Sequence, residues 1–167
     1  MDHDLTDAML DRLAATFPDL DLDHYHVTGR LARLGRLLAD RQEEVFGRFG
    51  LNRGEVGVLS ALRLAGPPYR LTPTRLGRGL LLSSAGITSR LDRLERRELV
   101  VRLPDPDDRR GVLIELTDKG AELVDAAIRA NTESESELLA DFNARDAETF
   151  ARLLRRLSSA LESRGGL

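Results

Sequence analysis

The sequence contains no cysteine and no tryptophan, and aromatic residues make up only 4% of its 167 positions. The absence of cysteine excludes disulfide bonds, cysteine-ligated zinc and thiol-based sensing of oxidants. No apolar run approaches the roughly 18 to 20 residues that cross a bilayer, and the charged N-terminal segment does not resemble a secretory leader. These features predict a globular, cytoplasmic protein with no membrane association, folded as one domain or two small ones.

Charge is distributed unevenly along the chain, although the net charge is only −3. Residues 70–110 hold 10 Arg and 6 acidic residues, a net charge of +4, whereas residues 1–69 and 111–167 carry −3 and −4. Of the 25 basic residues 24 are Arg, whose planar guanidinium can donate two parallel hydrogen bonds to phosphate or guanine. The clustering makes the middle of the chain the candidate surface for nucleic acid.

The spacing of apolar residues predicts a short helix over residues 5–17 and a long amphipathic helix over residues 26–49. Asn52 followed by Glu55 has the spacing of a helix cap with a reciprocating acid, and predicts a third helix that ends near Gly66.

Two further helices are predicted in the basic segment. Thr72 precedes Pro73, which favours a short helix to about Leu80, and Ser83 or Ser84 can cap the next helix. In that next helix, apolar residues fall on one face and small, polar or cationic residues on the other.

The helical spacing of apolar residues then stops. The short runs 99–103 and 112–116 are predicted to be strands, separated by a Pro- and Asp-rich turn. Thr117 can cap a helix that reaches about Leu139, and Asn143 can cap a last one. The predicted fold class is mainly α with a small β-hairpin wing: a winged helix-turn-helix. In that fold the helix after Ser83, the recognition helix, enters the major groove, and the hairpin reaches the flanking backbone or minor groove.

The side chains fit that placement. Short side chains at the start of the recognition helix let its backbone approach base edges, and cationic side chains further along can reach phosphate or guanine. Arginines at the wing tip can enter a narrow minor groove. The residues assigned to DNA contact are Thr72, Arg75, Ser83, Ser84, Gly86, Thr88, Ser89, Arg93, Arg96, Asp108, Arg109 and Arg110. Asp108 with Arg110 can alternatively form an ion pair that stiffens the wing and leaves DNA contact to Arg109.

The stretch from Ile87 to Gly120 resembles the signature of the MarR family of bacterial transcriptional regulators. The matching segments are Arg93-Leu94-Glu95, Leu99-Val100-Val101-Arg102, Asp108-Arg109-Arg110 and Leu116-Thr117-Asp118-Lys119-Gly120. One departure is Glu98, where the family usually has Gly to end the recognition helix.

The resemblance implies an obligate homodimer whose N- and C-terminal helices interlock. Residues 1–50 and 118–167 would form the dimerisation region and residues 51–117 the DNA-binding domain. Two-fold symmetry would place two recognition helices about 34 Å apart on an inverted-repeat operator. The implied function is a ligand-responsive transcriptional regulator, a repressor, that binds double-stranded DNA.

The chain is also similar to a urate-responsive subgroup of this family that has an added N-terminal helix. The pocket of that subgroup uses a Trp, an Asp and two Arg; the Arg positions match Arg90 and Arg102, whereas the Asp position holds Gly57 and the chain has no Trp. The resemblance therefore carries over the pocket location and a small anionic effector, but not urate. Arg90 can alternatively pack its stem and pair with an acid.

The sequence also permits two other functions. His24 and His26, with Asp21, Asp23 and His3 nearby, could bind a divalent metal and make the protein a metal-dependent regulator. The chain could also be a small-molecule-binding or protein-interaction dimer that has no sequence-specific DNA binding. No spaced nucleophile and base, phosphate-binding glycine loop or carboxylate pair is visible, so neither an enzyme nor a cofactor is predicted.

Overall fold

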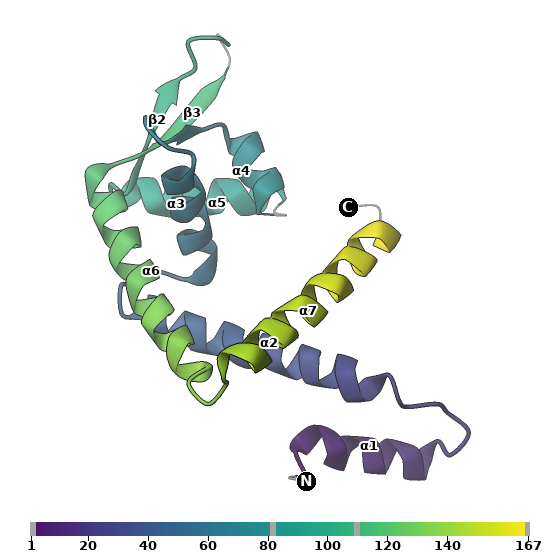
Figure 1. Ribbon diagram of the computed structural model, residues 1–167. Helices are drawn as coiled ribbons and strands as arrows, with labels where there is room; N and C mark the ends of the chain where they lie inside the picture. Colours follow the sequence, from purple (N-terminus) through teal and green to yellow (C-terminus); the bar gives the residue numbers. More distant parts are fainter. Residues whose placement is uncertain (1–2, 81–82, 109–110, 166–167) are drawn as a thin grey trace.

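The computed structural model describes residues 3–80, 83–108 and 111–165, and its helices and strands follow the predicted order closely (Figure 1). The helices and strands are α1 (Leu5–Thr16), α2 (Tyr25–Gly47), α3 (Arg53–Leu64), β1 (Arg70–Leu71), α4 (Pro73–Gly79), α5 (Ser84–Arg96), β2 (Val100–Pro104), β3 (Val112–Leu116), α6 (Asp118–Leu138) and α7 (Ala144–Gly165). No helix in these ranges has the length and apolarity that a membrane span requires.

The main hydrophobic core lies in the winged helix-turn-helix unit, where α3, α4 and α5 pack with the sheet and with α6. The largest fully buried side chains belong to this unit and to the start of α6: Leu59, Leu62, Leu76, Leu91, Leu94, Leu99, Ile114, Val58, Val100 and Val124. Close packing of these aliphatic side chains fixes α5 against α3 and the sheet. The predicted fold class, mainly helical with a small wing, is confirmed.

The sheet has one strand more than the sequence predicted. Its order is β1-β3-β2 with antiparallel pairing, and β1 adds only Arg70 and Leu71, opposite Glu115 and Ile114. Arg70 also forms an ion pair with Glu115. Two residues are too short to show an alternating pattern, because a period of two needs at least four residues to be recognised.

The predicted helix caps are present. Asn52 and Glu55 form the reciprocal cap of α3, and Thr72, Ser83 and Thr117 cap α4, α5 and α6. Each cap satisfies backbone N–H groups that the first turn of a helix leaves without partners. Local hydrogen bonds therefore fix where α3, α4, α5 and α6 begin.

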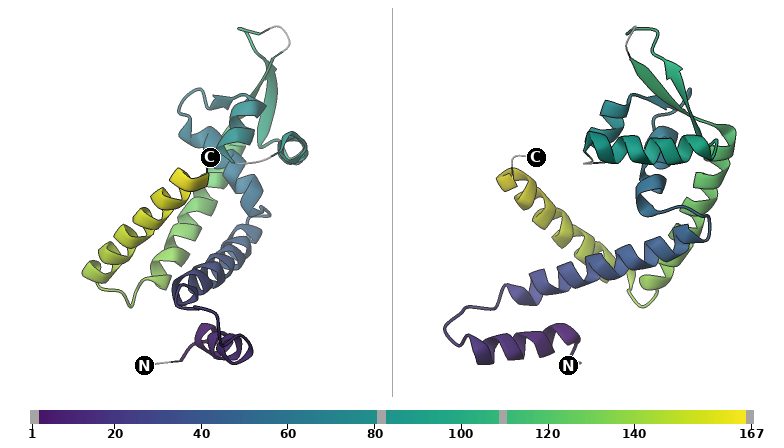
Figure 2. Two further views of the ribbon diagram at one scale, coloured as in Figure 1. Left: turned by 90° about the vertical axis from the view of Figure 1, so that its right-hand side faces the viewer. Right: turned by 180° about the vertical axis from the view of Figure 1, so that it is seen from behind.

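Long helices extend from the winged unit. Figure 1 shows α6 leading down from the wing to α2, and Figure 2 shows α7 standing apart from the winged unit. Arg63 on α3 joins α6 through a two-pronged ion pair with Asp125, at 3.0 Å, and donates a hydrogen bond to the hydroxyl of Tyr69. The hydrogen bond from Arg63 holds the pKa of Asp125 below its usual value.

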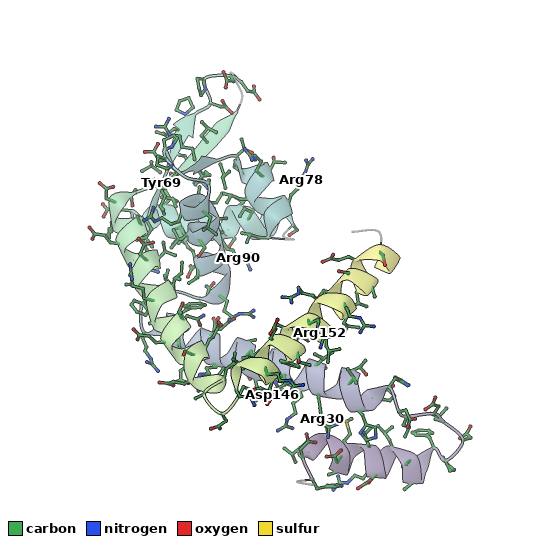
Figure 3. The ribbon with its side chains drawn as sticks, in the orientation of Figure 1. Arg30, Tyr69, Arg78, Arg90, Asp146 and Arg152 are labelled. Atoms are coloured by element: carbon green, nitrogen blue, oxygen red, sulfur yellow. The ribbon has the colours of Figure 1, made fainter. Side chains whose placement is uncertain are left out.

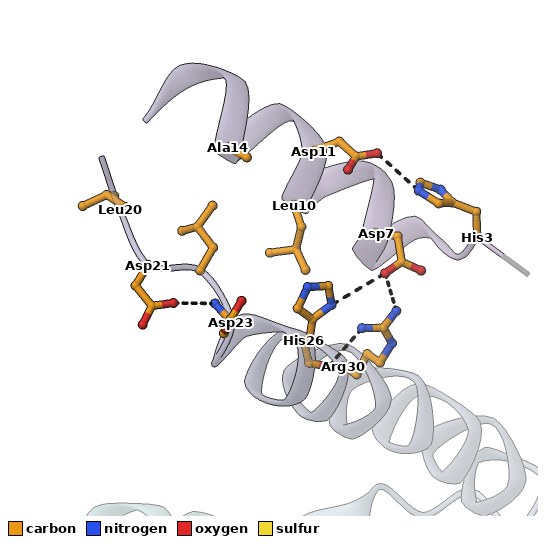
Figure 4. A pocket seen from close by; sticks show the side chains of 11 residues that line it. His3, Asp7, Leu10, Asp11, Ala14, Leu20, Asp21, Asp23, His26 and Arg30 are labelled. Atoms are coloured by element: carbon orange, nitrogen blue, oxygen red, sulfur yellow. Dashed lines mark hydrogen bonds and ion pairs between the residues drawn. The ribbon is translucent and has the colours of Figure 1, made fainter. Parts of the chain in front are cut away.

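The first helix packs on α2 through two buried side chains, Thr6 and Leu10, and several ion pairs (Figure 4). Leu10 is buried between the two helices, and Arg30 on α2 donates to Asp4 at 3.0 Å and to Asp7 at 2.7 Å. The hydrogen bond from Arg30, together with the backbone N–H of Asp4, lowers the pKa of Asp7 to about 2. Charged contacts therefore add to a small apolar contact in holding α1 in place.

Candidate nucleic-acid interface

The recognition-helix candidate α5 has one apolar and one polar face, as its sequence predicted. Ile87, Leu91 and Leu94 are 4%, 2% and 0% exposed and face the core. The Ser83 hydroxyl accepts from the backbone N–H of Gly86 at 3.2 Å and begins the helix. The core thus holds α5 by one side and leaves the other side for contact with another molecule.

A shallow hollow of about 500 Å³ runs along the exposed face of α5. Its lining residues are Ala85, Thr88, Ser89, Asp92 and Arg96. Small side chains permit a close approach of the helix to base edges, and hydroxyl groups can both donate and accept hydrogen bonds. The guanidinium of Arg96 donates only to the carbonyl oxygen of Asp92, at 3.2 Å, among the described residues, so its charge is not neutralised there.

Helix α4 adds two more exposed cations beside α5. The Thr72 hydroxyl accepts from the backbone N–H of Arg75 at 3.2 Å, and the side chains of Arg75 and Arg78 are exposed. Figure 3 shows Arg78 projecting from α4. Within the described ranges, neither arginine forms an ion pair with a carboxylate. Unpaired exposed arginines are suited to contact with phosphate.

The wing turn is held by its own backbone and by one glycine. The backbone N–H of Asp105 donates to the carbonyl oxygen of Gly111 at 3.1 Å, and the backbone N–H of Gly111 donates to the carbonyl oxygen of Asp108 at 2.8 Å. A Cβ atom on Gly111 would lie 2.8 Å from that of Asp105, so no other residue fits without a shift. Asp108 has further interactions of its own. Arg109 and Arg110, assigned to DNA contact, lie outside the described residues, and so does the side chain of Ser84.

Arg93 is not a free cation on the surface of α5. Its Nε donates to Oε1 of Glu55, at 2.9 Å, and its side chain is 43% exposed. The sequence assigned Glu55 only to the cap of α3. Its contact with Arg93 joins residues 38 positions apart, and no local pattern indicates such a pair.

Of the three residues assigned to an effector pocket, Arg102 lies apart from Arg90. Arg102 on β2 binds Asp92, at 2.6 Å, and Glu95, and the hydrogen bond to Asp92 raises the pKa of its guanidinium. At 100° per residue, Asp92 and Glu95 are about 200° and 140° around α5 from Arg90. Arg102 therefore lies on the opposite side of that helix.

Arg90 lies between α5 and the first turn of α3 (Figure 3). A Cβ on Gly54 would come within 2.3 Å of its Nε, so the guanidinium occupies space that only glycine leaves open. Nη1 donates to the carbonyl oxygen of Gly86 at 3.0 Å, whereas Nε is buried and has no partner among the described residues. Gly57 follows one turn later on α3, where a Cβ would meet Leu80 at 3.3 Å.

The histidines assigned to a metal site are spread over two places. His3 and His26 line a cleft of about 720 Å³ between α1 and α2, where they contact Asp11 at 3.2 Å and Asp7 at 3.8 Å (Figure 4). His24 instead contacts the ring of Tyr25. Within residues 3–80, 83–108 and 111–165, no three His, Asp or Glu side chains are grouped to hold a metal ion.

Comparison with known proteins identifies the family. A family model described as MarR family matches residues 49–111. The transcriptional regulator PecS of Dickeya dadantii is 34% identical over 86% of this chain and 87% of its own length. The chain belongs to the MarR family. The transcriptional repressor NicR of Pseudomonas putida, 32% identical over 87% of this chain and 93% of its own, agrees with that assignment.

Solved structures of MarR family proteins have the same fold. A regulator from Streptomyces coelicolor is 25% identical, with a TM-score of 0.72 over 86% of this chain and 98% of its own. A mutant MarR from E. coli in complex with operator DNA is 28% identical, with a TM-score of 0.69 over 83% and 99% of the two chains. This chain is therefore a transcriptional regulator with the winged-helix architecture of its family.

Proposed function

We propose that this MarR family protein is a repressor that binds an inverted-repeat operator as a homodimer, with residues 51–117 as its DNA-binding domain. The observation that carries the proposal is the exposed face of α5, where Thr88, Ser89 and Arg96 line one hollow. Exposed Arg75 on the neighbouring α4 can contact the phosphate backbone. The wing, with Arg109 and Arg110 in its turn, would reach the adjacent groove.

The proposed dimer uses residues 1–50 and 118–167. Large apolar side chains are exposed along one stripe of α2 and along α7: Val27, Leu34 and Leu38, and Phe150, Leu153 and Leu161. Exposed apolar area of this extent is rare on monomers and is typical of association surfaces. A second copy of the chain would cover these faces and place two recognition helices about one DNA turn apart, roughly 34 Å.

The direct test is footprinting on the DNA upstream of the protein's own gene, combined with sedimentation to measure the oligomeric state. The proposal predicts a dimer that protects two half-sites related by inversion. It also predicts that binding weakens steeply as salt rises, because phosphate contacts release counterions. A protein that remains dimeric but protects no DNA would instead be a binding or interaction dimer. A protein that remains monomeric at micromolar concentration would contradict the proposed assembly.

We further propose that a small anion, such as a carboxylate, binds beside Arg90 and Gly57 and releases the operator. The support is the buried Nε of Arg90 without a partner, which lies next to Gly54 at the positive N-terminal end of α3. An anion there would accept a hydrogen bond from Nε and would lie near the positive end of the α3 dipole. Arg102 is not part of this proposed site, because its ion pairs with Asp92 and Glu95 hold it on the opposite side of α5.

Thermal shift with benzoate, urate and inorganic phosphate as separate probes tests the effector site. A probe that binds the folded protein raises its melting temperature, and the rise grows with the logarithm of the probe concentration above the dissociation constant. Arg90→Gln should abolish the rise, whereas Arg12→Gln, far from the site on α1, should not. The same probe should lower operator affinity. A rise that survives in Arg90→Gln would place the anion elsewhere.

A further inference from the structure

Glu55 is unusual among the acidic residues because it is buried. It is 5% exposed, and among the described residues it is the only buried carboxylate. A buried charge is costly unless it is paired and hydrogen-bonded. The partners that stabilise the buried charge of Glu55 therefore indicate its role.

Each oxygen of the Glu55 carboxylate has a separate partner. Oε2 accepts from the backbone N–H of Asn52, at 3.1 Å, and completes the cap of α3. Oε1 accepts from Nε of Arg93, at 2.9 Å, and joins α3 to α5. The helix cap uses only Oε2, so the cap does not account for the contact between Oε1 and Arg93.

The two terminal nitrogens of the Arg93 guanidinium, Nη1 and Nη2, are available for a ligand. Among the described residues, Nη1 and Nη2 of Arg93 have no protein partner, and the side chain is 43% exposed. It faces a hollow of about 340 Å³ that is also lined by Arg96 and Arg97. Within the part of the chain that the structure describes, those two arginines donate to backbone carbonyl oxygens only. The hollow is thus lined by three guanidinium groups and one carboxylate.

We propose that Glu55 is a positioning residue for operator recognition, which holds Arg93 by Nε and so fixes the direction in which Nη1 and Nη2 meet the DNA. This inference rests on the proposed operator binding. A guanidinium held at one nitrogen loses less freedom when the other two bind phosphate or guanine. The same carboxylate balances the charge of Arg93, which limits its attraction to DNA of any sequence.

The test measures affinity for the operator and for a scrambled duplex of equal length, by fluorescence anisotropy over a range of salt. Glu55→Gln keeps the shape of the side chain but removes its charge. We expect the ratio of operator to scrambled affinity to fall about tenfold, which is the size of the discrimination that one good base contact supplies. We also expect the salt slope on scrambled DNA to steepen by about one, because one more cation is free.

The matched control is Asn52→Ala, which removes the other half of the same cap without touching Arg93. It should lower the melting temperature and leave the affinity ratio within about twofold of wild type. In an Arg93→Gln background, Glu55→Gln should change the ratio no further, because the two residues act as one unit. If Glu55→Gln does not fold, Glu55→Asp keeps the charge but shortens the reach, and should lower the ratio as well.

Three results would overturn the inference: an unchanged ratio in the folded Glu55 variants, an equal loss in Asn52→Ala, or a loss that persists without Arg93. The first two would leave Glu55 as a helix cap only, and the third would make its effect one of general charge. A wild-type protein that shows no preference for any duplex would instead contradict the proposed operator binding itself.

Discussion

The winged unit buries its large apolar side chains, whereas the long helices α2 and α7 leave many of theirs exposed. In the winged unit Leu59, Leu62 and Leu94 are completely buried. On α2 and α7, Leu34, Leu153 and Leu161 are 45%, 49% and 63% exposed. The first region can reach its full packing within one chain, whereas the second cannot. The difference supports the proposal that a second copy of the chain covers α2 and α7, and four changes test how each region is stabilised.

The largest effect is expected in the winged core. Leu94→Ala removes a fully buried side chain where α5, α3 and the sheet meet, and should lower the free energy of unfolding by about 2 to 5 kcal/mol. Urea denaturation measures it. Because the side chain is buried within one chain, the loss should not depend on protein concentration; a concentration-dependent loss would mean that this core is shared between subunits.

A charge on the exposed stripe of α7 should act on assembly instead. Leu153→Asp should weaken dimerisation at least about tenfold, since it removes an apolar contact and buries a charge. Sedimentation equilibrium gives the dissociation constant. Ser159→Asp, on the opposite face of the same helix, is the matched control and should leave the dimer intact. Equal behaviour of the two variants would show that the α7 stripe is not the interface.

A smaller change is expected at the end of α5, where the chain turns sharply. Glu98 has a positive φ of 60°, a conformation that costs about 1 kcal/mol or more for residues other than glycine. Its ion pair with Lys119, at 3.0 Å, is largely exposed and adds little. Glu98→Gly should therefore raise the melting temperature by about 2 to 4 °C, and a lower value would show that the Lys119 contact outweighs the backbone cost.

The smallest effect is the pH dependence of the α1 contact. The folded pKa of Asp7, about 2, lies below its usual value of 3.8 because Arg30 favours the charged form. The resulting stabilisation is complete above about pH 4 and is lost as the pH falls through 4 toward 2. The difference in melting temperature between wild type and Asp7→Asn should vanish over that interval. A difference that is constant from pH 6 to pH 2 would contradict the role given to this charge.

The sequence predicted what short-range patterns encode. The caps at Asn52, Thr72 and Ser83 join residues three positions apart, and the apolar face of α5 follows from helical spacing, so both could be found without a structure. The turn at Glu98, just after α5 ends, was also expected from the family resemblance. These are local properties, and most of the fold follows from them.

What the sequence did not predict depends on contacts between distant residues. Arg93 looked like a free DNA-contacting cation, but its partner Glu55 belongs to another helix. Arg90 and Arg102 were predicted to line the same pocket, but β2 brings Arg102 to Asp92 and Glu95 on the other side of α5. A charged side chain can pair with many oppositely charged groups in the sequence, and the packing of the helices and strands determines which of them lies within reach.

The most direct test of the central claim is a footprint of the wild-type dimer on the promoter of its own gene at moderate salt. The account predicts two protected half-sites in inverted orientation, with centres about one helical turn apart, 10 to 10.5 base pairs. Continuous protection without half-sites, or no protection at a concentration where the protein is dimeric, would contradict it.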